Sequence, residues 1–153
     1  MRQGEHILGI DYGRRRVGLA IATTALPGPR PLKTLHVTGE QDAVAQVALA
    51  LREAGAVAAV VGLPLHMDGT ESPMATEARR FAQMLRDATG SPVELMEERW
   101  SSKEAERSLR GSGLRGIERK ERIDSMAAQI LLQTYLEQQS HRRRRQAEDD
   151  SAR

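Results

Sequence analysis

The spacing of apolar residues changes from strand type to helix type along the chain, and it predicts an α/β protein. Short apolar runs at 7–10 and 17–22 have the composition of strands, and the glycine- and arginine-containing segment between them fits a hairpin connection. A third, weaker strand is expected at 34–38, after a proline-rich stretch. Apolar residues then recur at helical spacing over 41–54, and Gly55 fits the end of that helix.

The rest of the chain alternates strands and helices. We expect, in order, a buried strand at 57–61, a helix at 73–88, a strand at 93–96, a short helix at 101–109 and a last helix at 123–137. The glycine-rich segment 111–116 has no apolar periodicity and is expected to be mobile. This order predicts a mixed central sheet of about five strands, the first three antiparallel and the later ones linked by crossovers, flanked by helices.

Length and composition limit the domain organisation. The 153 residues fit one domain, which we expect to span 1–138, while residues 139–153 have almost no apolar side chain and are expected to form a disordered charged tail. Because there is no cysteine, neither a disulfide nor a zinc-thiolate site can form. No apolar stretch has the length of a membrane span, and residues 1–20 do not resemble a signal peptide, so we expect a cytoplasmic protein without a membrane partner.

Charge is more informative in its distribution than in its sum. The formal net charge is only +2, but basic residues cluster at 14–16, 107–122 and 141–145, where they could contact phosphates. For any one cluster alone, a solvated face is the competing interpretation. Aromatic residues make up 3% of the chain, which argues against an extended base-stacking platform, although Tyr12 and Trp100 could each stack one base.

Three acidic residues stand where packing does not explain a carboxylate. Asp11 and Glu98 each follow an apolar run of strand type, and Asp124 opens the last helix on its apolar stripe. A turn-forming Asp, an ion pair at a sheet end and a favourable helix dipole are the competing interpretations for Asp11, Glu98 and Asp124 respectively. A fold that brings the three together would collect oxygen ligands suited to one or two Mg²⁺ or Mn²⁺ ions.

The choice of Glu98 depends on strand alternation. Glu97 stands beside it, and successive side chains of a strand point to opposite faces, so only one of the two can join Asp11. We choose Glu98, in part because of the family resemblance that follows.

Four blocks of sequence stand out: GIDYG at 9–13 with VGLA at 17–20, VGLPLHMDGTE at 61–71, Glu98-Arg99 with the serines 101–102 and EA at 104–105, and IDS at 123–125 with the alanines 127–128. Together they resemble the YqgF family, also called RuvX or Holliday-junction-resolvase-like, of the ribonuclease H-like superfamily. The Gly-Leu-Pro block is the most specific. The chain departs from the family at Glu97, where an aspartate is usual, and at Trp100, where an aliphatic residue is common.

The resemblance implies a ribonuclease H-like fold and a bacterial cytoplasmic nuclease that acts on the 5′ end of pre-16S ribosomal RNA during ribosome maturation. Asp11, Glu98 and Asp124 would be its catalytic acids and metal ligands. Ribosomal precursor particles would be possible partners. Candidate substrate contacts, chosen from the basic clusters and the loop after the Gly-Leu-Pro block, are Arg14, Arg15, Arg16, Asp68, Thr70, Arg99, Arg115, Arg119 and Lys120. Asp68 and Thr70 could instead form a turn.

Three other functions stay open on the sequence. A resolvase would cut branched DNA with the same chemistry and would need paired active sites. A noncatalytic RNA-binding ribosome-assembly factor would need only the basic clusters, and an ATP-binding enzyme of the sugar kinase, actin and Hsp70 fold would need a second domain. The sequence does not decide between RNA and DNA, endonuclease and exonuclease, one metal ion and two, or monomer and homodimer. The roles of Glu97 and of the arginine-rich tail are also open.

Overall fold

The first two strands form the hairpin that the apolar runs predicted. The structure is a computed structural model that describes residues 4–23, 28–98 and 116–152. In it, β1 (His6–Asp11) and β2 (Arg16–Thr23) pair antiparallel, with Asp11 opposite Gly18. The expected helix at 101–109 and most of the glycine-rich segment lie outside the described residues.

The sheet is mixed, as predicted. Within the described residues it has six strands in the order β3-β2-β1-β5-β6, with β4 beside β2. β5 (Ala56–Pro64) pairs parallel with β1 and with β6 (Val93–Glu98). β3 (Arg30–Pro31) and β4 (Leu35–His36) are both antiparallel to β2; β4 lies within the expected third strand, 34–38, whereas β3 lies before it, in the proline-rich stretch. The expected third strand is therefore present only as the two residues of β4. β3 was not predicted; it pairs at the edge of the sheet, the position to which a proline such as Pro31 is confined because it donates no hydrogen bond.

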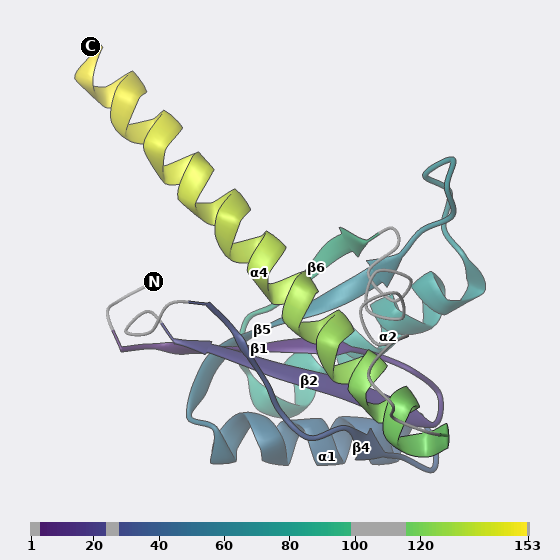
Figure 1. Ribbon diagram of the computed structural model, residues 1–153. Coiled ribbons are helices and arrows are strands. Elements are labelled where there is room, and N and C mark those ends of the chain that lie inside the picture. The colour runs from purple at the N-terminus through teal and green to yellow at the C-terminus, as the bar shows by residue number, and fades with distance from the viewer. Residues whose placement is uncertain (1–3, 24–27, 99–115, 153) are drawn as a thin grey trace.

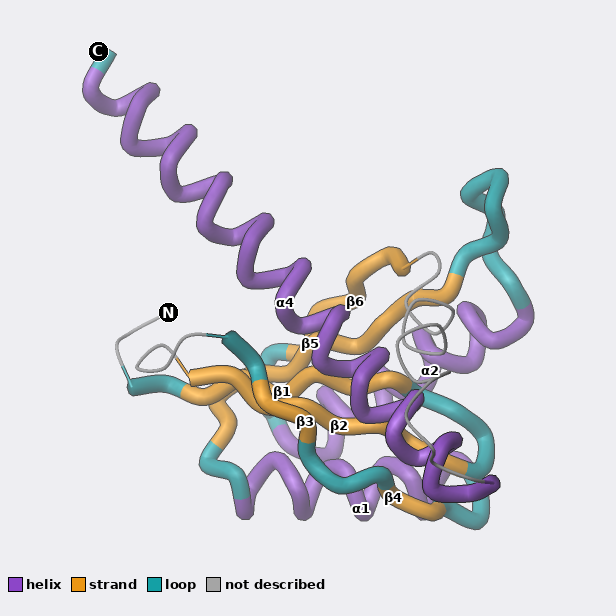
Figure 2. Tube along the Cα trace, in the orientation of Figure 1, coloured by secondary structure: helices purple, strands orange, loops and turns teal. Residues whose placement is uncertain are grey.

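Two helices cover one face of the sheet, close to their expected bounds. α1 (Glu40–Glu53) is followed by Gly55 at φ +64°, the left-handed conformation that favours glycine. α2 (Pro73–Thr89) begins at Ser72, whose hydroxyl accepts a hydrogen bond from the Ala75 amide, and has a proline in its first turn. Figure 2 shows both helices on the side of the strands opposite α4 (Gly116–Ser151).

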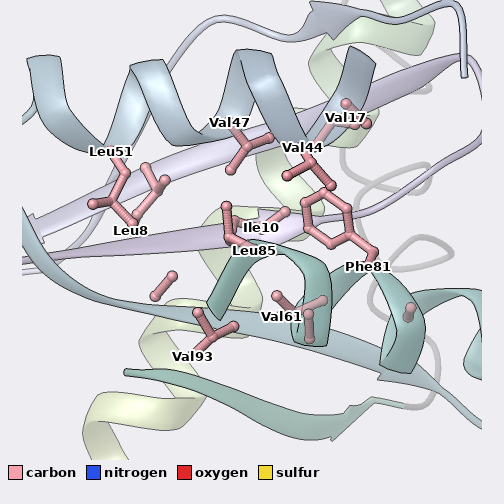
Figure 3. Close-up of a cluster of buried hydrophobic side chains, with 14 of the residues drawn as sticks. Leu8, Ile10, Val17, Val44, Val47, Leu51, Val61, Phe81, Leu85 and Val93 are labelled. Carbon is pink, nitrogen blue, oxygen red and sulfur yellow. The ribbon is translucent and has the colours of Figure 1, made fainter. Parts of the chain in front are cut away.

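Strand alternation divides the buried residues between the two faces. Figure 3 shows α1 and α2 directing Val47, Leu51, Phe81 and Leu85 towards strand residues such as Ile10. On the other face, α4 packs against apolar residues of β1, β2 and β5; this cluster comprises Ile7, Ala20, Ala22, Val60, Ala128, Leu131 and Leu132. Residues 8 and 10 of β1 therefore face α1 and α2, and residues 7, 9 and 11 face α4.

α4 is longer than the expected helix 123–137 at both ends. The expectation of disorder for residues 139–153 is wrong for residues 139–151, which are helical. The physical reason is that glutamine, arginine, alanine and glutamate favour helices, no glycine or proline follows Gly116, and a packed helix extends by one hydrogen bond per added residue. Residues 140–152 are exposed, and Figure 1 shows the end of α4 projecting beyond the sheet. The division of the chain into a domain at 1–138 and a tail stays a prediction.

No described helix is long and apolar enough to cross a membrane.

Candidate functional site

Three elements bring the predicted acids into one cleft. Asp11 ends β1, Glu98 ends β6, and Asp124 lies in the N-terminal part of α4. The cleft has a volume of about 340 Å³ and is lined by these acids together with Tyr12, Gly13, Arg14, Arg15, Arg16, Pro64 and Met74. The structure therefore places six of the predicted site residues together: the three acids and the three hairpin arginines.

Glycines at the interface with α4 allow Asp124 to approach Asp11. A Cβ atom on Gly18 would lie 2.1 Å from the backbone oxygen of Asp124, and one on Gly9 would lie 3.0 Å from that of Ala128. Any residue with a Cβ atom at position 18 would collide with the backbone of α4, so only glycine allows this close packing. Because Gly18 is opposite Asp11 in the hairpin, close packing here brings Asp124 over the end of β1.

A third glycine makes room for Glu98. A Cβ atom on Gly62 would lie 2.6 Å from Oε1 and 2.9 Å from Oε2 of Glu98, so this carboxylate lies directly over the Gly62 backbone. Gly62 belongs to β5, the strand between β1 and β6. The structure thus places Glu98 in the cleft, and Glu97 is not among the lining residues. Sequence reasoning did not assign this role to Gly62, although the residue opens the Gly-Leu-Pro block.

The carboxylates interact electrostatically. Burial raises the pKa of Asp11 well above its usual range, and the charges of Glu98 and Asp124 raise it further. Burial also raises the pKa of Asp124, while the hydrogen bond and charge of Arg16 act to lower it. Such mutual repulsion at a partly dehydrated site is typical of functional sites.

The three hairpin arginines differ in their partners. Nε of Arg16 donates to Oδ2 of Asp124 at 2.8 Å, and both side chains are partly buried. Arg14 forms an ion pair with Glu77 of α2 at 3.0 Å. Arg15 is exposed at the cleft, and no ion pair holds it within the part of the chain that the structure describes.

The donor chemistry of the cleft suits a divalent cation. Carboxylate oxygens are the ligands that Mg²⁺ and Mn²⁺ prefer, and a cation would relieve the repulsion that raises the pKa of Asp11. Among the described residues, no three acidic or histidine side chains are arranged to hold one ion together. Asp11 and Glu98 fit such a site in type and position, and Asp124 fits in type but is bound to Arg16.

Other predicted contacts lie elsewhere. Asp68 and Thr70 form the turn that the sequence allowed, because the Thr70 amide and hydroxyl donate to Oδ1 of Asp68 at 2.9 and 2.6 Å, and neither residue lines the cleft. Lys120 is exposed on α4. Arg99 and Arg115 lie outside the described residues, as does the side chain of Arg119.

The aromatic residue next to the first acid is already packed against the protein. The ring of Tyr12 stacks on Phe81 of α2, with 4.5 Å between the ring centroids. One face of Tyr12 is therefore not available to a base. The other residue considered for stacking, Trp100, lies outside the described residues.

The mixed sheet with helices on both faces has the fold of the RuvC-type, ribonuclease H-like α/β proteins. Among solved structures, T. thermophilus RuvC in complex with a Holliday junction substrate superposes with a TM-score of 0.56 at 18% identity, over 88% of this chain and 96% of that chain. The fowlpox virus Holliday junction resolvase gives a TM-score of 0.50 at 13% identity, over 87% and 98%. Identities this low establish the shared fold alone.

Sequence similarity defines the family. A family model described as "RuvX: Holliday junction resolvase" matches residues 5–138, and the chain belongs to this family. A relative from Anaeromyxobacter sp. (strain Fw109-5) is 49% identical over 131 residues, which cover 85% of this chain and 95% of the relative. One from Chloroflexus aurantiacus (strain ATCC 29366 / DSM 635 / J-10-fl) is 41% identical over 131 residues, 86% of each protein. Both relatives carry the name "Putative pre-16S rRNA nuclease".

Proposed function

We propose that this protein is a metal-dependent nuclease that hydrolyses phosphodiester bonds in the 5′-end processing of pre-16S rRNA. The observation that carries the proposal is the convergence of Asp11, Glu98 and Asp124 from three elements into one cleft beside the hairpin arginines. Membership of the RuvX family supports the nuclease, and the names of the relatives support the RNA substrate.

The acids would hold the metal and the arginines would hold the substrate. Asp11 and Glu98 would provide oxygen ligands for Mg²⁺ or Mn²⁺, and Asp124 would complete the set. When bound, one or two such ions would activate water and stabilise the charge that develops at the phosphodiester. The acids come from two strand ends and a packed helix, so the backbone positions that carry them are held by the fold before substrate arrives.

Phosphate contacts would position the strand beside the acids. Arg15 is the hairpin arginine best placed for this contact, because it is exposed at the cleft and not held by a described carboxylate. Such contacts fix a strand without reading its sequence, so recognition would depend on a strand end, a junction or a ribosomal precursor particle. The remaining candidates, Asp68, Thr70, Arg99, Arg115, Arg119 and Lys120, stay predictions, as do the cytoplasmic location and a monomeric or homodimeric state.

Cleavage of a labelled pre-16S 5′ leader tests the proposal. The purified protein is assayed with Mg²⁺, with Mn²⁺ and with EDTA, beside the Asp11→Asn variant. We expect metal-dependent cuts that Asp11→Asn loses while it still binds the RNA. Undiminished metal-dependent cleavage by Asp11→Asn would reject the assignment of the acids.

Branched DNA is the second candidate substrate, because the family description names a Holliday junction resolvase. A four-way DNA junction is therefore assayed in parallel with the leader. Cuts in the junction alone would identify a resolvase, and resolution of a symmetric junction would require a dimer with two active sites. Binding without cleavage of either substrate would support a noncatalytic RNA-binding assembly factor.

A further inference from the structure

The cleft contains a cation that belongs to the protein itself. Nε of Arg16 lies 2.8 Å from Oδ2 of Asp124, and the two side chains are 31% and 19% exposed. Arg14, in the same hairpin, is 66% exposed and pairs instead with Glu77, outside the acid cluster. Arg16 therefore neutralises Asp124, one of the three converging carboxylates.

We infer that Arg16 is a positioning residue that holds Asp124 in the metal-free protein, yields it to the divalent ion, and then turns to a substrate phosphate. This inference rests on the proposed function, because it concerns the same metal and the same nucleic acid. It assigns Arg16 two successive partners in place of a fixed role as a phosphate contact.

Competition for Asp124 follows from the charges. The Oδ2 atom that accepts from Arg16 is one of the two oxygens that Asp124 could offer to an ion. Arginine does not lose its proton in proteins, so the guanidinium can leave the carboxylate only by moving. An ion on Asp11 and Glu98 would repel the guanidinium and attract Asp124, and both forces favour the exchange.

Arg16 is also placed to move. It is the first residue of β2, at the end of the hairpin loop, and its side chain is partly exposed at a cleft that also contains Arg15. Its guanidinium suits the bidentate recognition of phosphate. Because metal and nucleic acid would both favour the released arginine, each would increase the affinity for the other.

Mn²⁺ binding without nucleic acid tests the exchange. Isothermal titration of the full-length protein is compared for the parent, Arg16→Gln, Arg16→Lys and the matched control Arg14→Gln, which removes the same charge from the same hairpin. We expect Arg16→Gln to bind Mn²⁺ about tenfold more tightly than the parent, equivalent to about 1.4 kcal/mol. Arg16→Lys should lie between them. Arg14→Gln should change the affinity by less than about twofold in 0.15 M salt, where screening weakens indirect effects.

Thermal unfolding separates the exchange from a loss of folding. Without metal, Arg16→Gln should unfold at a lower temperature than the parent, because Asp124 then loses its counter-ion. Mn²⁺ should raise the unfolding midpoint of Arg16→Gln by more than it raises the parent's. Equal or weaker Mn²⁺ binding by Arg16→Gln would overturn the exchange and leave the metal site intact. Absence of Mn²⁺ binding in the parent and in every variant would overturn the metal-dependent function together with this inference.

Discussion

Replacing Gly62 with alanine adds one methyl group at the point where Glu98 crosses β5. Gly62 is buried, and its φ is not in the left-handed region, so alanine can adopt its backbone conformation. The new Cβ atom would meet Oε1, Cδ and Oε2 of Glu98 at 2.6, 2.7 and 2.9 Å. The three nearest atoms all belong to the end of a flexible side chain, so we expect the carboxylate to move and the strand to stay in place.

The size of the effect follows from these distances. Because ordinary contact begins at 3.4 Å, Oε1 of Glu98 must move by about 0.8 Å. A displacement near 1 Å of a catalytic group reduces turnover by about 10²-fold. The fold should be little affected, since a glycine-to-alanine change that the backbone tolerates alters stability by about 1 kcal/mol or less. We therefore expect activity to fall by about 10²-fold with nearly unchanged folding.

Two other glycines provide the comparison. Gly39→Ala should leave activity unchanged, because a Cβ atom there would have nothing within 4 Å. Gly18→Ala should instead destabilise the whole protein, because its Cβ atom would meet the backbone oxygen of Asp124 at 2.1 Å and α4 would have to separate from β2. Initial rates of leader cleavage, Mn²⁺ affinity and thermal unfolding are measured for each variant.

Gly62→Ala is the decisive variant of the three. Parent-like cleavage and Mn²⁺ affinity in a folded Gly62→Ala protein would refute the reasoning, because the carboxylate would then not be needed at its position over β5. Loss of folding in this variant would show that the methyl group displaces the strand and not the side chain.

Three further predictions concern the charges. Glu98→Asp should lose about 10²-fold in cleavage rate although it keeps the carboxylate, since its shorter side chain withdraws the oxygens by more than 1 Å; a parent-like rate would contradict this. Because burial and neighbouring charges raise the pKa of Asp11, its stabilising contribution is full below the unfolded-state pKa of about 3.9 and is lost as pH rises through the folded-state value. Asp11→Asn should thus be more stable than the parent at pH 7 without metal, and urea unfolding should show the difference shrinking towards pH 4. Changing Arg142, Arg143, Arg144 and Arg145 to glutamine should reduce the salt slope of RNA binding by about 3 if the exposed end of α4 contacts single-stranded phosphates, and an unchanged slope would mean that it does not.

Periodicity predicted the architecture because each buried element carries its own signal. Helical spacing gave α1 and α2 to within a residue or two, and apolar runs gave β1, β2, β5 and β6. The inward face of Asp124 was visible for the same reason, since it lies on the stripe that carries the buried Ala127 and Ala128. Element bounds and buried faces could therefore be predicted from the sequence, because the spacing of neighbouring residues encodes them.

Features that depend on contacts between distant segments could not be predicted in this way. The pairs Arg16–Asp124 and Gly62–Glu98 join elements that only the tertiary fold brings together, and nothing in the local sequence distinguishes Arg16 from Arg14. The length of α4 was not predicted because its last turns make few contacts of any kind. Its exposed end buries nothing, so hydrophobicity gives no signal there, and only helix propensity favours the helix.

The types of acid in the cleft follow from the distances that each must cross. Asp11 is on β1 itself, and Asp124 is brought close to it by Gly18, so two short side chains suffice. β6 is separated from β1 by β5, which places its backbone about 10 Å away at the usual strand spacing. A longer glutamate is needed to span that gap, and it can cross β5 only where no side chain stands in its way, at Gly62. The fold must bring three carboxylates from separate elements together in one cleft. The glycines on the α4 face and the choice of Asp, Glu and Asp at the three positions together meet this requirement.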